Sequence, residues 1–194
     1  FLKAGELVAI PTETVYGLAA NALNEDAVLK IYAAKNRPQF NPLIIHVASF
    51  EQAKQYIKDI SVEAEQLAAA FWPGPLTMLF NKQQNVPDLV TAGSKRVAVR
   101  VPNHPLSIQL LSQLNFPVAA PSANPSGYVS PTTAQHVYEG LHNKIPYILD
   151  GGACGVGVES TIVGWNENNE LELYRLGGVA VSYTHLRAHE TKAN

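Results

Sequence analysis

Apolar and polar positions follow two different periods along the chain. Short runs of aliphatic residues, which predict buried strands, are separated by segments whose apolar residues recur at helical spacing. The expected strands cover residues 5–10, 43–47, 76–80, 97–101, 117–120, 146–149, 159–163 and 171–175. The expected helices cover residues 24–35, 49–57, 61–71, 106–114 and 130–138. Strands and helices alternate through three quarters of the chain and strands dominate afterwards, which predicts one mixed-sheet α/β domain.

Capping residues place the starts of four of these helices. Asn24 is followed by two acidic residues, and Ser49 forms a capping box with Gln52. Ser61 is expected to cap the third helix in the same way. Ser130 precedes a proline, which suits the first helical position, so we expect it to cap the last helix.

Composition limits the class of protein. The chain has 194 residues, 46% of them hydrophobic, which suits a single domain with a buried core. The net charge of -2 means that any anion site must be a local cluster of basic residues. Cys154 is the only cysteine, which excludes an internal disulfide and favours a reducing compartment. No apolar run reaches membrane-spanning length and no signal peptide is recognisable, so we expect a cytoplasmic protein without membrane association.

The two ends of the chain have less regular sequence. The chain begins with Phe1 and enters a strand almost at once, so we expect the natural N-terminus to lie upstream. In residues 182–194, Leu186 is the one aliphatic side chain larger than alanine, so no apolar helical stripe can form there. We therefore predict one domain over residues 1–181 and a non-native tail over 182–194. Removal of this tail should change the free energy of unfolding by less than about 0.5 kcal/mol.

Familiar nucleotide and metal motifs are absent from the sequence. It contains no G-x-x-x-x-G-K-[ST] loop, no G-x-G-x-x-G turn and no G-x-S-x-G nucleophile elbow. No His and Cys residues have metal-ligand spacing, so we expect no dedicated metal site. Five polar clusters remain at the ends of apolar strands, where open α/β sheets usually bind ligands. These clusters cover residues 11–22, 35–43, 94–101, 119–130 and 151–161.

Two of these clusters are basic. Lys35 and Arg37 lie near a helix end, where they could form a triphosphate clamp or simply terminate the helix. Arg96 and Arg100 share one face of a strand with Ala98, opposite three valines. A cation within such an apolar run is costly unless it is paired or faces a ligand cavity. The alternative is an edge strand whose arginines face water.

The other clusters are rich in hydroxyls and glycine, and each has a plain structural interpretation. Residues 11–22 could be a turn with N-cap residues, and residues 119–130 could be an ordinary Pro/Ser/Gly loop. His46 is a single histidine on a strand, for which a satisfied core position is the simpler interpretation. Cys154 has no neighbouring base in the sequence, so we expect an inert thiol.

The order of the clusters is more specific than any one of them. Between residues 2 and 178 the chain contains, in this order, PTETVYGL, AKNRPxxNPLIIHV, FWPGPLT, VAVRVPNHP, APSANPSG with SPTT, DGG and GVESTIV. This series resembles the YrdC-like threonylcarbamoyl-AMP synthase family, in its short, single-domain form. The resemblance implies a single-domain α/β fold, with a twisted mixed sheet flanked by helices and a basic ligand cleft. The catalytic domain would then be residues 1–181.

The resemblance also implies an activity. Members of this family are nucleotidyltransferases that combine L-threonine, bicarbonate and ATP into threonylcarbamoyl-AMP and release pyrophosphate. A separate tRNA-modifying complex then transfers the threonylcarbamoyl group to an adenosine of certain tRNAs, and a weak direct contact with tRNA is a further option. Mg²⁺ is expected to accompany ATP, held largely by phosphate and water.

Site residues are carried over from the matching motifs. The threonine side would consist of Thr14, His46, Arg100, Ala120 (through its backbone) and Ser160. The ATP side would consist of Lys35, Arg37, Asn41, Arg96, Ser122, Ser130 and Arg175, with Lys35 and Arg37 also catalytic. Arg100 can hold a carboxylate with both arms of its guanidinium, while Lys35 and Arg37 can neutralise phosphates. The chain departs from the family pattern at Leu176, where proline is usual, and at Ala19, where glycine is frequent.

Two other functions stay open on sequence alone. A carbamoyl-transfer module of the hydrogenase-maturation type is one, although such a domain normally sits in a longer chain with zinc-finger-like cysteines. An RNA-binding module that grips phosphates in a basic cleft is the other. The net charge of -2 and the hydroxyl-rich pocket weigh against the RNA-binding module.

Overall fold

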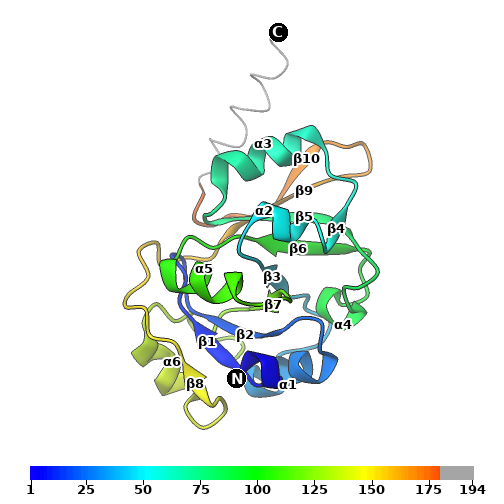
Figure 1. Cartoon of the computed structure of the whole chain (residues 1–194). Helices are drawn as coiled ribbons and strands as arrows, with labels where there is room; N and C mark the ends of the chain where they lie inside the picture. The colour runs from blue at the N-terminus through cyan, green and yellow to red at the C-terminus, as the bar shows by residue number, and fades with distance from the viewer. Residues whose placement is uncertain (180–194) are drawn as a thin grey trace.

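The computed structural model describes residues 1–179, which form one twisted, ten-stranded mixed sheet with helices packed around it (Figure 1). The strand order is β10-β9-β5-β6-β3-β7-β2-β1-β8, and β4 pairs with β5 outside this path. The strands are β1 (Val8–Ile10), β2 (Gly17–Asn21), β3 (Ile44–His46), β4 (Ile57–Lys58), β5 (Leu76–Lys82), β6 (Arg96–Arg100), β7 (Val118–Ala119), β8 (Tyr147–Ile148), β9 (Thr161–Trp165) and β10 (Leu171–Arg175). The helices are η1 (Leu2–Ala4), α1 (Glu25–Lys35), α2 (Phe50–Ala53), α3 (Val62–Phe71), α4 (Asp88–Thr91), α5 (Pro105–Ser112) and α6 (Ala134–Leu141). The predicted α/β class is confirmed.

The helices lie along the whole length of the sheet. Helix α1 packs against β2, α4 against β6 and α6 beside β8. Figure 1 shows α3 at the end of the molecule formed by β9 and β10, with α6 near the opposite end. The strands β3, β6 and β7 therefore lie in the middle of the sheet, deep within the molecule. None of the helices within residues 1–179 is long and apolar enough to span a membrane.

Both faces of the sheet are buried at β1, as its consecutive residues show. Val8 and Ile10 pack into a smaller cluster with Leu111 of α5 and with Phe116. Ala9, between them, packs into the large cluster on the other face. A strand that is covered on both faces has a continuous apolar sequence, as VAI in β1 does.

The first three predicted N-caps are confirmed. The side chains of Asn24, Ser49 and Ser61 each accept a hydrogen bond from the backbone N–H three residues later. The helix after Ser49 is shorter than predicted, because α2 is a single turn and Ile57 already belongs to β4. Ile57 pairs with Lys82 of β5, so sheet formation overrides the local helical pattern.

The predicted cap of the last helix is wrong. Helix α6 begins at Ala134, and its N-cap is Thr133, whose hydroxyl accepts from the backbone N–H of His136. Ser130 lies before the helix because its hydroxyl donates instead to the carboxylate of Glu159, 29 residues later in the chain. This partner cannot be recognised from the local sequence.

Two strands correct the sequence-based picture of the sheet. Strand β2 is absent from the predicted elements, yet it pairs with β1 and β7 in antiparallel fashion. Four of the five residues of its sequence, GLAAN, are of types that are depleted in strands, so the local signal favours a turn. Strand β6 lies between β5 and β3, so the alternative of an edge strand facing water is wrong.

Candidate active site

A cavity of about 350 Å³ lies over the middle strands of the sheet. Its wall draws on all five polar clusters, from the loop after β1 to the β9–β10 hairpin. Nine of the twelve residues predicted for the site line this cavity: Thr14, Arg37, His46, Arg96, Arg100, Ala120, Ser122, Ser160 and Arg175. Lys35, Asn41 and Ser130 are not on its wall. The fold therefore brings most of the predicted site together from segments up to 161 residues apart, the separation of Thr14 and Arg175.

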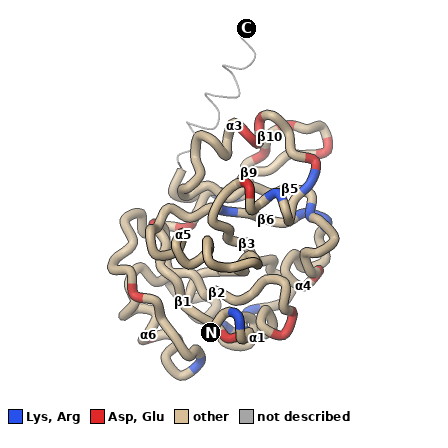
Figure 2. Tube along the Cα trace, in the orientation of Figure 1, with Lys and Arg blue, Asp and Glu red and all other residues tan. Residues whose placement is uncertain are grey.

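The cavity is basic although the chain as a whole is slightly acidic. Arg37, Arg96, Arg100 and Arg175 line it, and Glu159 is the one carboxylate on its wall among the described residues. Elsewhere acidic and basic residues are interspersed along the chain (Figure 2). Because the walls of a cleft concentrate the field of like charges, this arrangement favours an anionic ligand.

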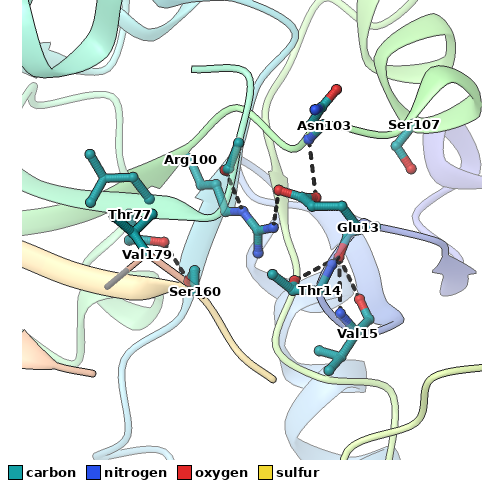
Figure 3. Close-up of polar contacts among 12 residues, drawn as sticks. Glu13, Thr14, Val15, Thr77, Arg100, Asn103, Ser107, Ser160 and Val179 are labelled. Carbon is teal, nitrogen blue, oxygen red and sulfur yellow. Dashed lines mark hydrogen bonds and ion pairs between the residues drawn. The ribbon is translucent and has the colours of Figure 1, made fainter. Parts of the chain in front are cut away.

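Arg100, at the end of β6, is the most deeply buried of these cations. Its side chain is 5% exposed, and its Nη2 lies 2.8 Å from Oε1 of Glu13 (Figure 3). Its Nε donates to the carbonyl of Gly74 at 3.3 Å, and Oε2 of Glu13 accepts from the backbone N–H of Asn103 at 3.1 Å. Burial lowers the pKa of Arg100, and the charge of Glu13 opposes this shift. The buried cation therefore has the partner that its place in an apolar strand requires.

His46 lies beside Arg100, because β3 and β6 are parallel and these two residues are in register. Burial, and then the charge of Arg100, lowers the pKa of His46 to about 3. The imidazole is therefore neutral near pH 7. Its Nδ1 has no hydrogen-bond partner within residues 1–179, which does not fit a satisfied core histidine. A neutral ring with an open nitrogen on a cavity wall suits a polar ligand.

Hydroxyl groups line the cavity next to these two side chains. Ser160 shares a hydrogen bond with the hydroxyl of Thr77 at 2.7 Å, and its Oγ also accepts from Nη2 of Arg175 at 3.1 Å. Nε of Arg175 donates to the backbone carbonyl of Ser160 at 3.0 Å. Thr14 shares a hydrogen bond with Thr12 at 2.8 Å. Arg175 is thus held in the cavity wall, although the residue that follows it departs from the family pattern.

Lys35 lies behind the wall rather than on it. Its Nζ donates to the backbone carbonyl of Ser122 at 2.5 Å and to that of Asn124, and the residue is only 1% exposed. Burial, and then the charge of Arg37, lowers the pKa of Lys35 to about 7. The carbonyl acceptors favour the charged ammonium and oppose this shift. Because these contacts are short and enclosed, we regard Lys35 as protonated and as an anchor of the loop that carries Ser122.

The remaining predicted residues have other partners. The backbone carbonyl of Asn41 accepts from the hydroxyl of Tyr32 at 3.2 Å, which fixes the loop after α1. Ser130 donates to Glu159, and this hydrogen bond is the main cause that lowers the pKa of Glu159. The hydroxyl of Ser130 therefore acts on the cavity through Glu159 in this structure.

Comparison with known proteins decides the family. The Sua5/YciO/YrdC family profile, which carries the description "telomere recombination", matches residues 1–177. The chain belongs to this family. Threonylcarbamoyl-AMP synthase of Pyrococcus abyssi is 54% identical over 167 residues, which are 86% of this chain and 49% of the relative. Threonylcarbamoyl-AMP synthase of Bacillus subtilis is 48% identical over 179 residues, which are 92% of this chain and 51% of the relative.

Solved structures of the Sua5/YciO/YrdC family share the fold. The crystal structure of P. abyssi Sua5 complexed with L-threonine matches with a TM-score of 0.92 and 51% identity, over 95% of this chain and 54% of that one. E. coli YciO matches with a TM-score of 0.83 over 93% of this chain and 87% of that one, but its 20% identity supports the fold alone. The chain spans about half the length of the curated relatives named above.

Three residues of this Sua5/YciO/YrdC site were not among the predicted ones. Glu13 pairs with Arg100, Glu159 lines the cavity, and Tyr174 stacks its ring 5.3 Å from the guanidinium carbon of Arg96. Glu13 and Glu159 lie within the PTET and VEST strings, directly before Thr14 and Ser160. Their position beside predicted ligand residues is the signal that could have indicated them, whereas nothing local indicates Tyr174.

Proposed function

We propose that this chain is an L-threonylcarbamoyladenylate synthase, a nucleotidyltransferase that converts L-threonine, bicarbonate and ATP into threonylcarbamoyl-AMP, pyrophosphate and water. The observation that carries the proposal is the cavity itself, whose wall holds a buried arginine, a neutral histidine, hydroxyl groups and three further arginines. The relatives of that name, at 48% and 54% identity, support the same reaction. The P. abyssi Sua5 structure, which is a complex with L-threonine, supports the amino-acid substrate.

We place the threonine at the Arg100 end of the cavity. The guanidinium of Arg100 would hold the carboxylate, a charge-assisted contact with two parallel hydrogen bonds. Thr14, Ser160 and the neutral imidazole of His46 would surround the polar groups of the amino acid. The backbone N–H of Ala120 already donates to the carbonyl of Ile44 at 3.0 Å, so Ala120 would contribute its own carbonyl oxygen.

We place ATP at the other arginines. Arg37, Arg96 and Arg175 would face the phosphates, and Ser122 would donate its hydroxyl. Lys35 would act from beneath the loop of Ser122, by fixing that loop and adding positive charge close to the phosphates. Asn41 and Ser130 also belong to the proposed ATP side, and Ser130 would have to exchange Glu159 for the nucleotide.

The chemistry needs positioning and charge neutralisation more than proton transfer. The carbamate formed from threonine and bicarbonate is an anion, and it must attack the anionic α-phosphate in line with the departing pyrophosphate. Two negative reactants repel each other, so cations fixed in advance on the cavity wall lower the barrier. In this scheme Lys35 and Arg37 are the catalytic cations. A protein general base is not required for the attack of a preformed carbamate.

We expect Mg²⁺ to enter with ATP, where it would neutralise phosphate charge. Residues 1–179 contain no group of three or more His, Cys, Asp or Glu side chains that could hold a metal ion. This donor set fits an ion that is bound mainly by phosphate oxygens and water, with Glu159 as the one carboxylate on the cavity wall.

The product has a reactive mixed anhydride and must be consumed by an acceptor. We propose that a separate tRNA-modifying transferase complex takes it up in the cytoplasm, and that this chain itself contacts tRNA weakly at most. The basic residues described above face into the cavity rather than forming a broad outer surface, which supports a small-molecule site.

Pyrophosphate release tests the proposal. The purified chain is incubated with ATP and Mg²⁺, and release is measured with threonine and bicarbonate together and with each omitted in turn. We expect release to depend on both co-substrates, because the carbamate is the only nucleophile placed at the α-phosphate. Equal release without threonine would contradict the assigned reaction.

A further inference from the structure

Glu13 holds Arg100 in place by an unusual pairing. Oε1 of Glu13 lies 2.8 Å from Nη2 of Arg100, yet neither atom makes a hydrogen bond with any group of residues 1–179. The two atoms are close enough for strong attraction, but their contact falls outside the angular range of a well-aligned hydrogen bond. The pair therefore balances charge and leaves the N–H groups of Nη2 available to a ligand.

Other contacts fix Glu13 itself. Its Oε2 accepts from the backbone N–H of Asn103, just beyond β6, and its backbone carbonyl accepts from the N–H of Val156 at 2.8 Å. The side chain is 14% exposed and is not part of the cavity wall. Figure 3 shows it between Arg100 and Asn103. Glu13 thus connects its own loop after β1 to the loops of Asn103 and Val156, and it lies behind the cavity wall. Its charge acts on Arg100, which is part of that wall.

We propose that Glu13 is a positioning residue that tunes the Arg100 end of the cavity to a zwitterionic amino acid rather than to a simple anion. This inference rests on the proposed role of Arg100 in binding threonine. Arg100 alone would be a buried, unbalanced cation and would attract any small anion. Paired with Glu13, it forms a couple without net charge, so Glu13 offsets part of the attraction of Arg100 for a ligand carboxylate. A positive charge on the ligand recovers that loss through its attraction to Glu13. An α-amino acid carries both charges, whereas the corresponding hydroxy acid carries only one.

The substitution that isolates this effect is Glu13→Gln. Glutamine keeps the size of the side chain and an oxygen acceptor for Asn103, but it removes the negative charge. The matched control is Glu6→Gln, because Glu6 also forms an ion pair, with Lys30 at 2.7 Å, but is not part of the cavity wall. The probe is 3-hydroxybutyrate, which is threonine without its ammonium group.

The experiment measures KM for threonine, KM for ATP and Ki for 3-hydroxybutyrate by pyrophosphate release. We expect Glu13→Gln to raise KM for threonine about tenfold, the cost of one impaired charge-assisted contact, and to lower Ki for 3-hydroxybutyrate. KM for ATP of Glu13→Gln should stay within about threefold of the wild-type value, since the arginines proposed to bind ATP are unchanged. Glu6→Gln should change none of the three constants. A folded Glu13→Gln protein with an unchanged ratio of KM for threonine to Ki for 3-hydroxybutyrate would overturn the inference.

Two further arms keep the test decisive. If Glu13→Gln does not fold, Glu13→Asp replaces it, because aspartate keeps the charge but is too short to reach both partners. We expect Glu13→Asp to raise KM for threonine while preserving the preference over 3-hydroxybutyrate, and a variant identical to wild type would contradict the positioning role. A wild-type chain without threonine-dependent release would instead refute the proposed function, and this inference with it.

Discussion

Arg100 illustrates how burial fixes a side chain that we propose binds the substrate. One nitrogen of its guanidinium donates a hydrogen bond to the carbonyl of Gly74, and another forms an ion pair with Glu13. The plane of the guanidinium is therefore fixed before a ligand binds. Arg100→Lys keeps the positive charge but loses this planar fork. We expect affinity for threonine to fall about ten- to a hundredfold, with KM for ATP nearly unchanged. Steady-state titration of each substrate checks this, and an equal loss for both would indicate a structural role for Arg100.

His46 should make the fold sensitive to mild acid. Its pKa is lowered from the ordinary value of 6.5 to about 3, so between these values the unfolded chain binds a proton that the folded chain does not. Stability from this group is therefore complete above pH 6.5 and is lost as the pH falls toward 3. The loss amounts to about 2 kcal/mol at pH 5.

The variant His46→Asn removes that titration. We expect its free energy of unfolding to fall less than that of wild type between pH 7 and pH 5, as measured by urea denaturation at each pH. His142→Asn, on the exposed end of α6, is the control and should follow wild type. Parallel curves for wild type and His46→Asn would show that His46 does not titrate in this way.

Among single residues, the sequence predicts those on the cavity wall better than the residues that hold them in place. Strand alternation places Arg96 and Arg100 on one face, and the structure puts both on the cavity wall. Glu13 and Glu159 are harder to predict, because their roles depend on contacts with distant residues. Glu13 pairs with Arg100, 87 residues away, and Glu159 accepts from Ser130, 29 residues away. Partners so distant in sequence become neighbours only through the fold.

At the scale of elements, the cavity depends on how closely β2 approaches the loop after β7. Gly17, the first residue of β2, bridges to Ser122, and a Cβ added at Gly17 would lie 3.2 Å from Cβ of Ala120. The loop would have to yield by a few tenths of an ångström. Glycine at this point therefore allows the close approach of Ala120, which we propose contributes its backbone to the threonine site.

Gly17→Ala tests this dependence. We expect KM for threonine to rise about threefold to tenfold and the free energy of unfolding to fall by about 1 kcal/mol, because the added methyl displaces a packed loop. Gly155→Ala is the control, since a Cβ there meets no atom within 4 Å. Steady-state kinetics gives KM for threonine, and thermal melts give the change in stability, for both variants. An unchanged KM for threonine in Gly17→Ala would show that this close approach does not position the site.

The elements also show where local sequence stops being informative. Caps such as Asn24 and Ser61 could be predicted because the whole interaction lies within four residues. Strand β2 and the short helix α2 could not, because β2 is made by pairing with β1 and β7, and α2 is cut short where Ile57 joins β5. Long-range pairing decided these cases against local propensity.

At the scale of the whole molecule, a chain with a net charge of -2 builds a cavity lined by four arginines. Composition alone would not predict this, because the arginines come from the loop that follows α1, from β6 and from β10. The order of the motifs predicted the family and the fold. Apolar periodicity alone predicted only a mixed-sheet α/β domain. The predicted tail over 182–194 and the domain boundary at 181 lie outside the described residues and stay predictions.

The identity of the product tests the central claim most directly. The chain is incubated with ATP, Mg²⁺, threonine and isotopically labelled bicarbonate, and the nucleotide products are analysed by mass spectrometry. If Arg100 holds the carboxylate of threonine and the amino group forms the carbamate, the product is AMP joined to threonine through one labelled carbon, formed in equal amount to pyrophosphate. An adenylate of threonine without the label would mean that the carboxylate itself attacks the α-phosphate, and it would contradict the assigned orientation and the proposed reaction.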